Sequence, residues 1–205
     1  MVKDTTNEEK GYAKINLALH VTGIQADGYH ALDSIVVFTD VFDRLFFKRS
    51  LKNVVTLTGE FSGSINVQEN SILQALKLFG NGLTDRFSIN LEKNLPIGAG
   101  LGGGSADAAA VIRFITNNSK HLMPSSEALS KIGADIPACV LSVASRVRGI
   151  GEIVRPLDIS EINLWVVLVN PDIFVSTGSI FEEVTEKYNQ PLESFMDLSL
   201  SLIHI

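Results

Sequence analysis

Residues 95–110 read Leu-Pro-Ile-Gly-Ala-Gly-Leu-Gly-Gly-Gly-Ser-Ala-Asp-Ala-Ala-Ala, with five glycines in the seven positions from 98 to 104. Glycine costs conformational entropy, so such a cluster needs a reason, and close approach of a ligand to bare backbone is the usual one. The alanine-rich run that follows predicts a helix over 106–117, with Ser105 as its N-cap. A loop of free N–H groups entering a helix N-terminus predicts an anion site, and a nucleotide phosphate is the favoured anion.

This loop differs from two common phosphate-binding motifs. No Gly-Lys-Ser/Thr follows the glycines, which excludes a Walker loop. Gly98, Gly100 and Gly103 match Gly-x-Gly-x-x-Gly, but dinucleotide folds place a buried strand before that pattern and an acidic residue about 20 positions later. Residues 87–93 instead alternate apolar and polar, which predicts a half-exposed antiparallel strand, and residues 108–126 contain no acidic residue. The dinucleotide interpretation is therefore disfavoured.

Composition restricts the class of protein. The 205 residues are 45% hydrophobic and 20% charged, which fits a soluble globular protein with a substantial core. A formal net charge of −6 argues against nucleic acid as the main partner. The single cysteine, Cys139, excludes an internal disulfide, fits a reducing compartment and stands among apolar neighbours, as core residues do. Residues 1–10 are polar and no apolar run could span a membrane, so we expect a cytoplasmic protein without a signal peptide.

Periodicity along the chain predicts strands first and a mixture of strands and helices afterwards. This order is typical of an α+β fold with a mostly antiparallel sheet. The predicted strands are residues 12–21, 34–47 (one or two strands), 54–57, 86–92 and 164–169, and a hairpin is predicted over 146–154. The predicted helices are residues 72–79, 106–117 and 127–132, the last capped by Ser125 or Ser126.

Three segments, in the expected order, resemble motifs of the GHMP small-molecule kinases. The first is Ala13-Lys14-Ile15-Asn16-Leu17-Ala18-Leu19-His20 followed by Ala26-Asp27-Gly28-Tyr29-His30-Ala31-Leu32. The second is the glycine-rich segment, and the third is Gly133-Ala134-Asp135-Ile136-Pro137. The triple glycine and the Asp-Gly-Tyr-His loop resemble the branch that phosphorylates a cytidine-diphosphate-linked methylerythritol in non-mevalonate isoprenoid biosynthesis. The resemblance runs from about residue 12 to about residue 181.

The resemblance implies a fold and a reaction. Residues 1–155 would form the ATP-binding N-terminal domain, of the type of ribosomal protein S5 domain 2, and residues 156–205 an incomplete second α/β domain. The reaction would be transfer of a phosphoryl group from ATP, with Mg²⁺, to the 2-hydroxyl of the small-molecule substrate. Two alternatives stay open: another GHMP kinase, for mevalonate, homoserine or a sugar, and a non-catalytic nucleotide-binding remnant.

The resemblance also assigns candidate catalytic residues. Asp135 would be the general base, although an aspartate between alanine and Ile-Pro also suits a turn or a helix cap. Lys14 would lie beside it and stabilise the carboxylate, which predicts a contact between Lys14 and Asp135. Asn16 lies two residues further along the predicted strand, on the face of Lys14, and would orient substrate or phosphate.

Three residues are candidates for holding the cytosine base. In the family that this chain resembles, Tyr29 would stack on the ring and His30 would hydrogen-bond its edge. Phe181 would be the second stacking aromatic. From the residues alone, a surface Tyr-His pair and an ordinary core phenylalanine are equally compatible with the sequence.

The glycine-rich segment would bind the nucleotide phosphates through its backbone. A flexible turn is the alternative, although Pro96 and Leu101 stiffen the segment. Asp107 would favour the helix N-terminus electrostatically rather than hold a metal through water, and no protein metal site is expected. The candidate nucleotide-binding residues are Pro96, Gly98, Gly100, Leu101, Gly102, Gly103, Gly104 and Ser105.

A third motif of the family, a glycine-rich loop near the C-terminus, has no counterpart here. After Gly151 the sequence contains one glycine, Gly178. This predicts a chain shortened at its C-terminal end, with apolar surface left exposed where the rest of the second domain would pack. Such a surface would favour a homodimer.

Overall fold

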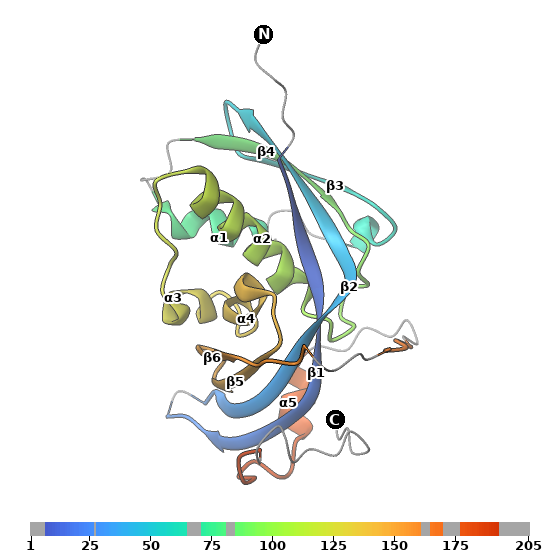
Figure 1. Cartoon of the computed structure of the whole chain (residues 1–205), viewed down its shortest axis with the longest axis vertical. Helices are drawn as coiled ribbons and strands as arrows, with labels where there is room; N and C mark the ends of the chain where they lie inside the picture. Colours follow the sequence, from blue (N-terminus) through green and yellow to red (C-terminus); the bar gives the residue numbers. More distant parts are fainter. Residues whose placement is uncertain are drawn as a thin grey trace.

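A long two-stranded antiparallel ribbon runs most of the length of the molecule (Figure 1). Strand β1, Asn7–Ile24, pairs with strand β2, His30–Ser50. The computed structural model describes residues 7–26, 28–64, 71–80, 85–160, 165–169 and 177–192, and all structural statements refer to these. Both strands are longer than predicted, and β2 is one continuous strand.

Strand β2 is the centre of a six-stranded sheet with the order β3-β4-β2-β5-β6 and with β1 paired to β2. The upper half of β2 pairs with β4 and the lower half with β5, both antiparallel, and β3 runs parallel to β4. The predicted mostly antiparallel sheet is therefore confirmed. The remaining strands are β3, Val54–Thr58; β4, Arg86–Glu92; β5, Ser145–Gly149; and β6, Ile153–Pro156.

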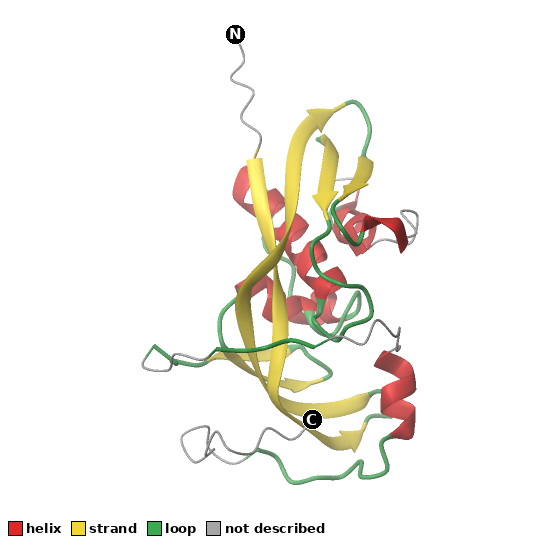
Figure 2. Cartoon of the chain, turned by 90° about the vertical axis from the view of Figure 1, so that its right-hand side faces the viewer, coloured by secondary structure: helices red, strands yellow, loops and turns green. Residues whose placement is uncertain are grey.

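Four helices lie on one side of the ribbon, and a fifth packs at its lower end (Figures 1 and 2). Helix α2 is central, and every residue from Ala106 to Ile112 is buried, as expected of a helix that is apolar almost all round. The ring of Phe114 stacks on Phe47 of β2, with centroids 3.8 Å apart. The helices are α1, Ser71–Leu78; α2, Gly103–Asn118; α3, Ser126–Ser130; α4, Ile136–Leu141; and α5, Thr177–Glu183, with a short 3₁₀ turn, η1, at Ser62–Ser64. Among the described helices, none combines the length and the apolar character that crossing a membrane requires.

Several local predictions are confirmed. Strand β4 has the predicted bounds, and strands β5 and β6 form the predicted hairpin. Ser125 caps α3, because its hydroxyl accepts a hydrogen bond from the backbone N–H of Ala128 at 3.3 Å. These features depend on neighbours in sequence, which is why a local pattern suffices to predict them.

Two local predictions are wrong. Helix α2 begins at Gly103, and Gly102 is its N-cap in the left-handed conformation, so Ser105 lies inside the first turn and does not cap the helix. The glycines allow the helix to start earlier than the alanine run suggests. The predicted strand at 164–169 is absent from residues 165–169, which pair with no other strand, and Leu164 lies outside the described residues.

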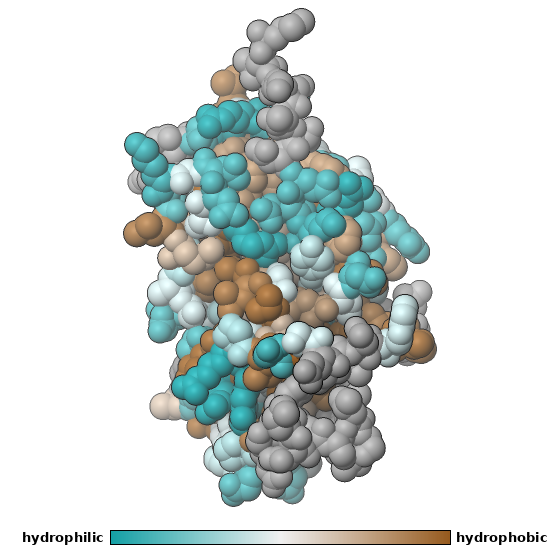
Figure 3. Space-filling model, viewed as in Figure 1, coloured by the Kyte–Doolittle hydropathy of each residue, from teal (hydrophilic) through white to brown (hydrophobic). Residues whose placement is uncertain are grey.

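Large apolar side chains are exposed at several places among the described residues. Trp165 is 99% exposed, and Val167 and Val169 are nearly as open. Elsewhere, Leu141 at the end of α4 and Val143 just after it are half exposed, and Figure 3 shows apolar surface gathered in the region of this helix. These side chains are exposed, and that the rest of a second domain would pack on them stays a prediction.

Cys139 packs inside the main core and is buried, as its apolar neighbours predicted. Burial raises the pKa of its thiol well above the ordinary range, so little of the reactive thiolate exists at neutral pH. We expect native protein to resist alkylation by iodoacetamide at pH 7.5, and protein unfolded in urea to react promptly. Mass spectrometry of both samples measures this, and rapid modification of the native protein would contradict the packing described.

Candidate active site

The glycine-rich loop presents bare backbone to solvent. Gly98, Gly100 and Gly102 have positive φ angles of 70°, 73° and 65°, which side chains other than glycine rarely tolerate. A Cβ atom added to Gly100 would meet no atom within 4 Å. The loop therefore leaves open space beside its backbone, as an anion cradle requires.

The loop is fixed between β1 and α2. The backbone N–H of Lys14 donates to the carbonyl of Leu101 at 2.9 Å, and α2 begins two residues later. The N-terminal end of a 16-residue helix carries a partial positive charge, which attracts anions. Backbone donors and the helix dipole thus act on the same space.

Lys14 and Asp135 meet beside this loop, as predicted. The Nζ atom of Lys14, a residue only 5% exposed, lies 3.2 Å from Oδ2 of Asp135 and donates to Oδ1 of Asn16 at 2.7 Å. Asn16 in turn donates to the hydroxyl of Ser34 at 2.7 Å. Irregularities in the β1–β2 register on either side of Lys14 and Asn16 re-aim these side chains. The ammonium is therefore held in one place by neighbours on both sides.

Asp135 occupies the position before α4 without acting as its cap. Its side chain makes no capping hydrogen bond and is 39% exposed. A Cβ atom on Gly102 would lie 3.4 Å from Oδ2 of Asp135 and 3.3 Å from Cε of Lys14, so the loop packs directly on this pair. A carboxylate that is open to solvent, beside a fixed cation and a phosphate-type loop, can accept a proton from a hydroxyl placed there.

The turn between β5 and β6 supports the Asp135 segment. Gly151 has a φ of 120°, and a Cβ atom there would lie 2.0 Å from the carbonyl oxygen of Ala134. Glu152 holds the turn, because its carboxylate accepts from the backbone N–H of Ile150 at 2.7 Å. Only glycine allows this approach, and the turn therefore determines where Ala134 and its neighbour Asp135 stand.

Ser105 lies close to the same segment from the opposite side. A Cβ atom on Gly133 would lie 3.2 Å from the hydroxyl oxygen of Ser105. The first turn of α2 and the segment leading to Asp135 are therefore in contact. The structure brings together, in one region, Lys14, Asn16, Leu101, Gly102, Ser105 and Asp135.

The residues predicted to hold a base form a second group. The rings of His30 and Phe181 stack with centroids 5.2 Å apart, although the residues are 151 positions apart in the sequence. Nε2 of His30 is buried without a hydrogen-bond partner among the described residues. Tyr29 is 64% exposed, and Asp27 of the same motif lies outside the described residues.

Asp107 does not have the role predicted for it. It is buried and its Oδ2 atom lies 3.2 Å from the Nζ of Lys93, which also binds Asp43. Burial raises the pKa of Asp107 to about 8, with Lys93 opposing the rise and Asp43 adding to it. A carboxyl group that is largely protonated at neutral pH supplies little negative charge to the helix N-terminus. Its burial also removes it from any metal bound at the loop.

The shifted pKa of Asp107 predicts a pH dependence of stability. The folded-state pKa lies above the ordinary value of 3.8, so between about pH 4 and pH 8 the folded protein holds a proton that the unfolded chain has lost. This contribution to stability is complete below pH 4 and is lost as the pH rises through 8. We expect wild type to lose more stability than Asp107→Asn between pH 5 and pH 8, measured by urea unfolding. Parallel curves for the two proteins would contradict the assignment.

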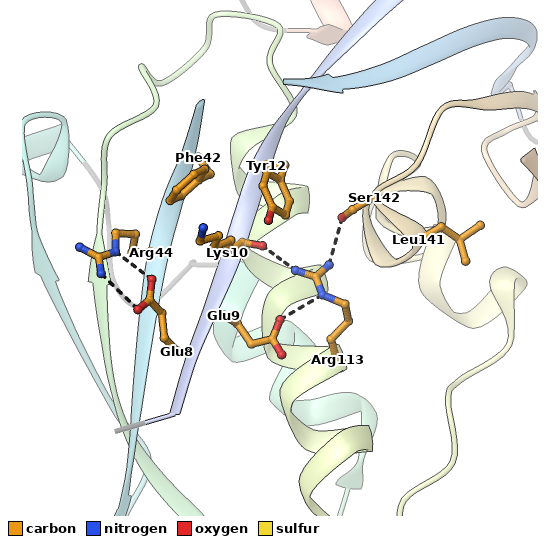
Figure 4. Close-up of a pocket in the computed structure, with 9 residues that line it drawn as sticks. All are labelled: Glu8, Glu9, Lys10, Tyr12, Phe42, Arg44, Arg113, Leu141 and Ser142. Atoms are coloured by element: carbon orange, nitrogen blue, oxygen red, sulfur yellow. Dashed lines mark hydrogen bonds and ion pairs between the residues drawn. The ribbon is translucent and has the colours of Figure 1, made fainter. Parts of the chain in front are cut away.

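A pocket of about 810 Å³ lies elsewhere on the same domain (Figure 4). Both of its arginines are already paired with glutamates: Arg44 Nε lies 2.9 Å from Glu8 and Arg113 Nε lies 3.1 Å from Glu9. The pocket is lined by Glu8, Glu9, Lys10, Tyr12, Phe42, Arg44, Arg113, Leu141 and Ser142, none of which is a predicted site residue. The candidate site is therefore the loop and the Lys14–Asp135 pair rather than this hollow.

Sequence reasoning missed two kinds of residue near the site. Ser34 connects Asn16 to the carbonyl of Ala18, and nothing in the apolar run around it marks it. Lys93 and Asp43 form a buried ion pair directly before the loop. The available signal was that Lys93 continues the alternation of Phe87, Ile89 and Leu91 on the apolar face of β4.

The fold and this site define a class of protein. Residues 70–151 match the family model described as the GHMP kinases N terminal domain. The α+β fold class is thereby confirmed, whereas the domain boundary at residue 155 stays a prediction.

The most similar proteins found share one name. The 4-diphosphocytidyl-2-C-methyl-D-erythritol kinase of Cereibacter sphaeroides is 40% identical over 181 residues, covering 88% of this chain and 64% of that protein. The kinase of the same name from Rhizobium johnstonii is 44% identical over 194 residues, covering 90% and 63%. The chain thus spans slightly less than two thirds of the length of the curated relatives it matches.

Two solved structures are similar to this chain in fold. A crystal structure of 4-(cytidine 5'-diphospho)-2C-methyl-D-erythritol kinase matches with a TM-score of 0.60 at 33% identity, covering 74% of this chain and 55% of that one. Mevalonate diphosphate decarboxylase from Legionella pneumophila, with a TM-score of 0.50 and 13% identity over 74% of this chain and 53% of that one, shares the fold alone.

Proposed function

We propose that this chain binds MgATP and transfers a phosphoryl group to the 2-hydroxyl of 4-diphosphocytidyl-2-C-methyl-D-erythritol. The observation that carries the proposal is the Lys14–Asp135 pair, with Nζ 3.2 Å from Oδ2, packed against Gly102 of the phosphate-type loop. The names of the relatives supply the substrate.

Nucleotide binding would use the backbone of the glycine-rich loop. The open space beside Gly100 and the start of α2 suit a triphosphate, and the N–H groups from Gly100 to Ser105 would surround it. Magnesium would enter as part of MgATP, where it neutralises phosphate charge. Phosphoryl transfer depends mainly on positioning and on charge neutralisation, which this loop and Lys14 can provide.

Proton transfer would involve Asp135. The substrate hydroxyl would approach the exposed carboxylate, which would take its proton as the new P–O bond forms. The ammonium of Lys14 would stabilise the negative charge that develops on the hydroxyl oxygen. Asn16, which accepts from Lys14 and donates to Ser34, would keep the ammonium directed at this point.

Recognition of the cytosine base would fall to the second group. His30 and Phe181 already stack, and the buried Nε2 atom of His30 has no partner among the described residues. Tyr29 would add a stacking surface from its exposed position. The exposed apolar residues near α4 would be the contact surface if the chain forms a homodimer.

Two other functions remain as competitors. Another GHMP kinase activity is supported only by the shared fold, and a panel of mevalonate, homoserine and sugar acceptors separates it from the proposal. A nucleotide-binding protein without transferase activity is the other alternative, and an ADP-release assay separates it from the proposal.

A coupled ADP-release assay with MgATP and the cytidine-linked acceptor, run beside thermal-shift titrations, tests the proposal. We expect turnover with this acceptor and not with the panel. Thermal shifts with both ligands but no turnover would favour the non-catalytic alternative. The absence of both a thermal shift and turnover would reject the proposed function for this chain.

A further inference from the structure

Three ionisable side chains form a buried cluster directly beneath the glycine-rich loop. Lys93, Asp43 and Asp107 are 4%, 0% and 2% exposed. Removing one member of such a cluster is strongly destabilising, yet apolar side chains of equal volume often serve as well for stability alone. Stability is therefore a weak reason for burying three ionisable groups here, and their positions suggest another.

The cluster holds the entrance of the loop. One oxygen of Asp43, Oδ1, accepts from the backbone N–H groups of Asn94 at 2.6 Å and Leu95 at 2.8 Å, and Oδ2 binds the ammonium of Lys93. The backbone of Lys93 is itself fixed, because its N–H donates to the carbonyl of Thr58 at 2.7 Å. The residues immediately before Pro96 therefore have little freedom.

The same cluster holds the exit of the loop. The Nζ atom of Lys93 lies 3.2 Å from Oδ2 of Asp107, in the second turn of α2. A Cβ atom on Gly103 would lie 2.9 Å from that Nζ atom, so the start of the helix rests against the ammonium. Leu95 is thus held through Asp43, and Gly103 lies directly against the Lys93 ammonium that Asp43 binds.

The charge balance of the cluster agrees with such a role. Burial raises the pKa of Asp107 to about 8, so this carboxyl group adds less negative charge to the cluster than an ordinary aspartate does. The second oxygen of Asp107, Oδ1, has no hydrogen-bond partner among the described residues and faces the backbone at Gly11 of β1. The ionisable groups that face Asp107 within the cluster are Lys93 and Asp43.

We propose that Asp43, Lys93 and Asp107 are positioning residues that hold both ends of the glycine-rich loop and so keep its backbone N–H groups arranged for a triphosphate. The inference builds on the proposed function, since it assigns a nucleotide to the loop. The cluster acts through the loop backbone and does not itself touch the phosphates.

Hydrogen exchange of the nucleotide-free protein tests the arrangement of the loop. Lys93→Met removes the ammonium and keeps an apolar stem. We expect exchange of the amides from 97 to 104 to rise at least about tenfold while peptides from β1 and β2 keep their protection. The matched control is Asp33→Asn, which breaks another buried ion pair, with Arg146 at 2.7 Å, far from the loop in sequence. The control should destabilise without selective exchange in the loop.

A second pair of variants covers the case in which Lys93→Met does not fold. Asp107→Asn keeps an acceptor for Lys93 and should keep the loop protected, whereas Asp107→Leu removes the acceptor and should raise exchange there. Equal exchange in these two variants, or a Lys93→Met effect no larger in the loop than that of Asp33→Asn, would overturn the proposal.

Calorimetric titration with MgATP links the cluster to the ligand. Lys93→Met and Asp107→Leu should weaken binding at least about tenfold, which corresponds to about 1.4 kcal/mol, while Asp33→Asn and Asp107→Asn should bind as wild type does. Unchanged affinity in a variant whose loop exchange has risen would overturn the link to the nucleotide. If wild type binds no MgATP but the exchange results are as expected, the proposed function fails and the positioning role stands.

Discussion

Asp135→Asn should lower the rate of phosphoryl transfer by about 10²–10⁴-fold, the range that a positioned general base contributes. The amide keeps the shape of the side chain but cannot take the hydroxyl proton. Because the Asp135 side chain is 39% exposed and makes no capping hydrogen bond, the variant should still fold, with some loss of stability from the lost ion pair with the buried Lys14. Steady-state kinetics with saturating MgATP and acceptor measure the effect as a change in kcat.

The control for this variant is Asp40→Asn, an exposed aspartate of β2 outside the candidate site. It should keep wild-type kcat and both KM values. An Asp135→Asn protein with wild-type kcat would remove Asp135 as the base and leave Lys14 and the loop as a binding site only. A loss of MgATP affinity equal to the loss of rate would instead assign Asp135 to binding.

Gly151→Ala should lower the free energy of unfolding by about 2–5 kcal/mol, the sum of left-handed backbone strain and overpacking. The new methyl group would lie 2.0 Å from the carbonyl oxygen of Ala134, so the β5–β6 turn or the Ala134 backbone must move. Either movement shifts Asp135, the next residue. We therefore expect kcat to fall in any Gly151→Ala protein that still folds. Urea unfolding and steady-state kinetics measure the two effects.

Gly80→Ala is the control that separates the cost of backbone strain from the cost of a steric clash. Gly80 also has a positive φ, 53°, but a Cβ atom there would meet nothing within 4 Å. This variant should lose only about 1–2 kcal/mol and should keep its kcat. Equal destabilisation by the two substitutions would mean that the contact between Gly151 and Ala134 has no energetic weight.

The parts of the fold that could be predicted from sequence are those set by near neighbours. Alternation in residues 86–92 predicted β4 correctly, and Ser125 predicted the start of α3. The run at 165–169 has the composition of a strand, but a strand exists only with a partner, and the described residues offer it none. Ser105 failed as a cap because a left-handed glycine at 102 could begin the helix earlier.

The candidate site was predictable where motif and chemistry coincide. The Lys14–Asp135 contact joins residues 121 positions apart, and only the resemblance to a kinase family brought them together before the structure did. The cluster of Asp43, Lys93 and Asp107 escaped prediction because burial of a charge is not a local property. A lysine at the end of an alternating strand is usually solvated, and three separate segments must pack before this one is enclosed.

The central position of β2 has a consequence for synthesis of the chain. Its lower half pairs with β5, whose residues follow more than 100 positions later in the chain. Translation proceeds at about 5–20 residues per second, so the nascent β1–β2 ribbon waits roughly 5–20 s until β5 has been synthesised. An unpaired strand edge invites association with other chains, and inward-pointing charges discourage it. Lys14, Asp33 and Asp43 all lie on this ribbon and become buried only when later segments arrive. The charges that organise the finished protein would thus also protect the unfinished one on the ribosome.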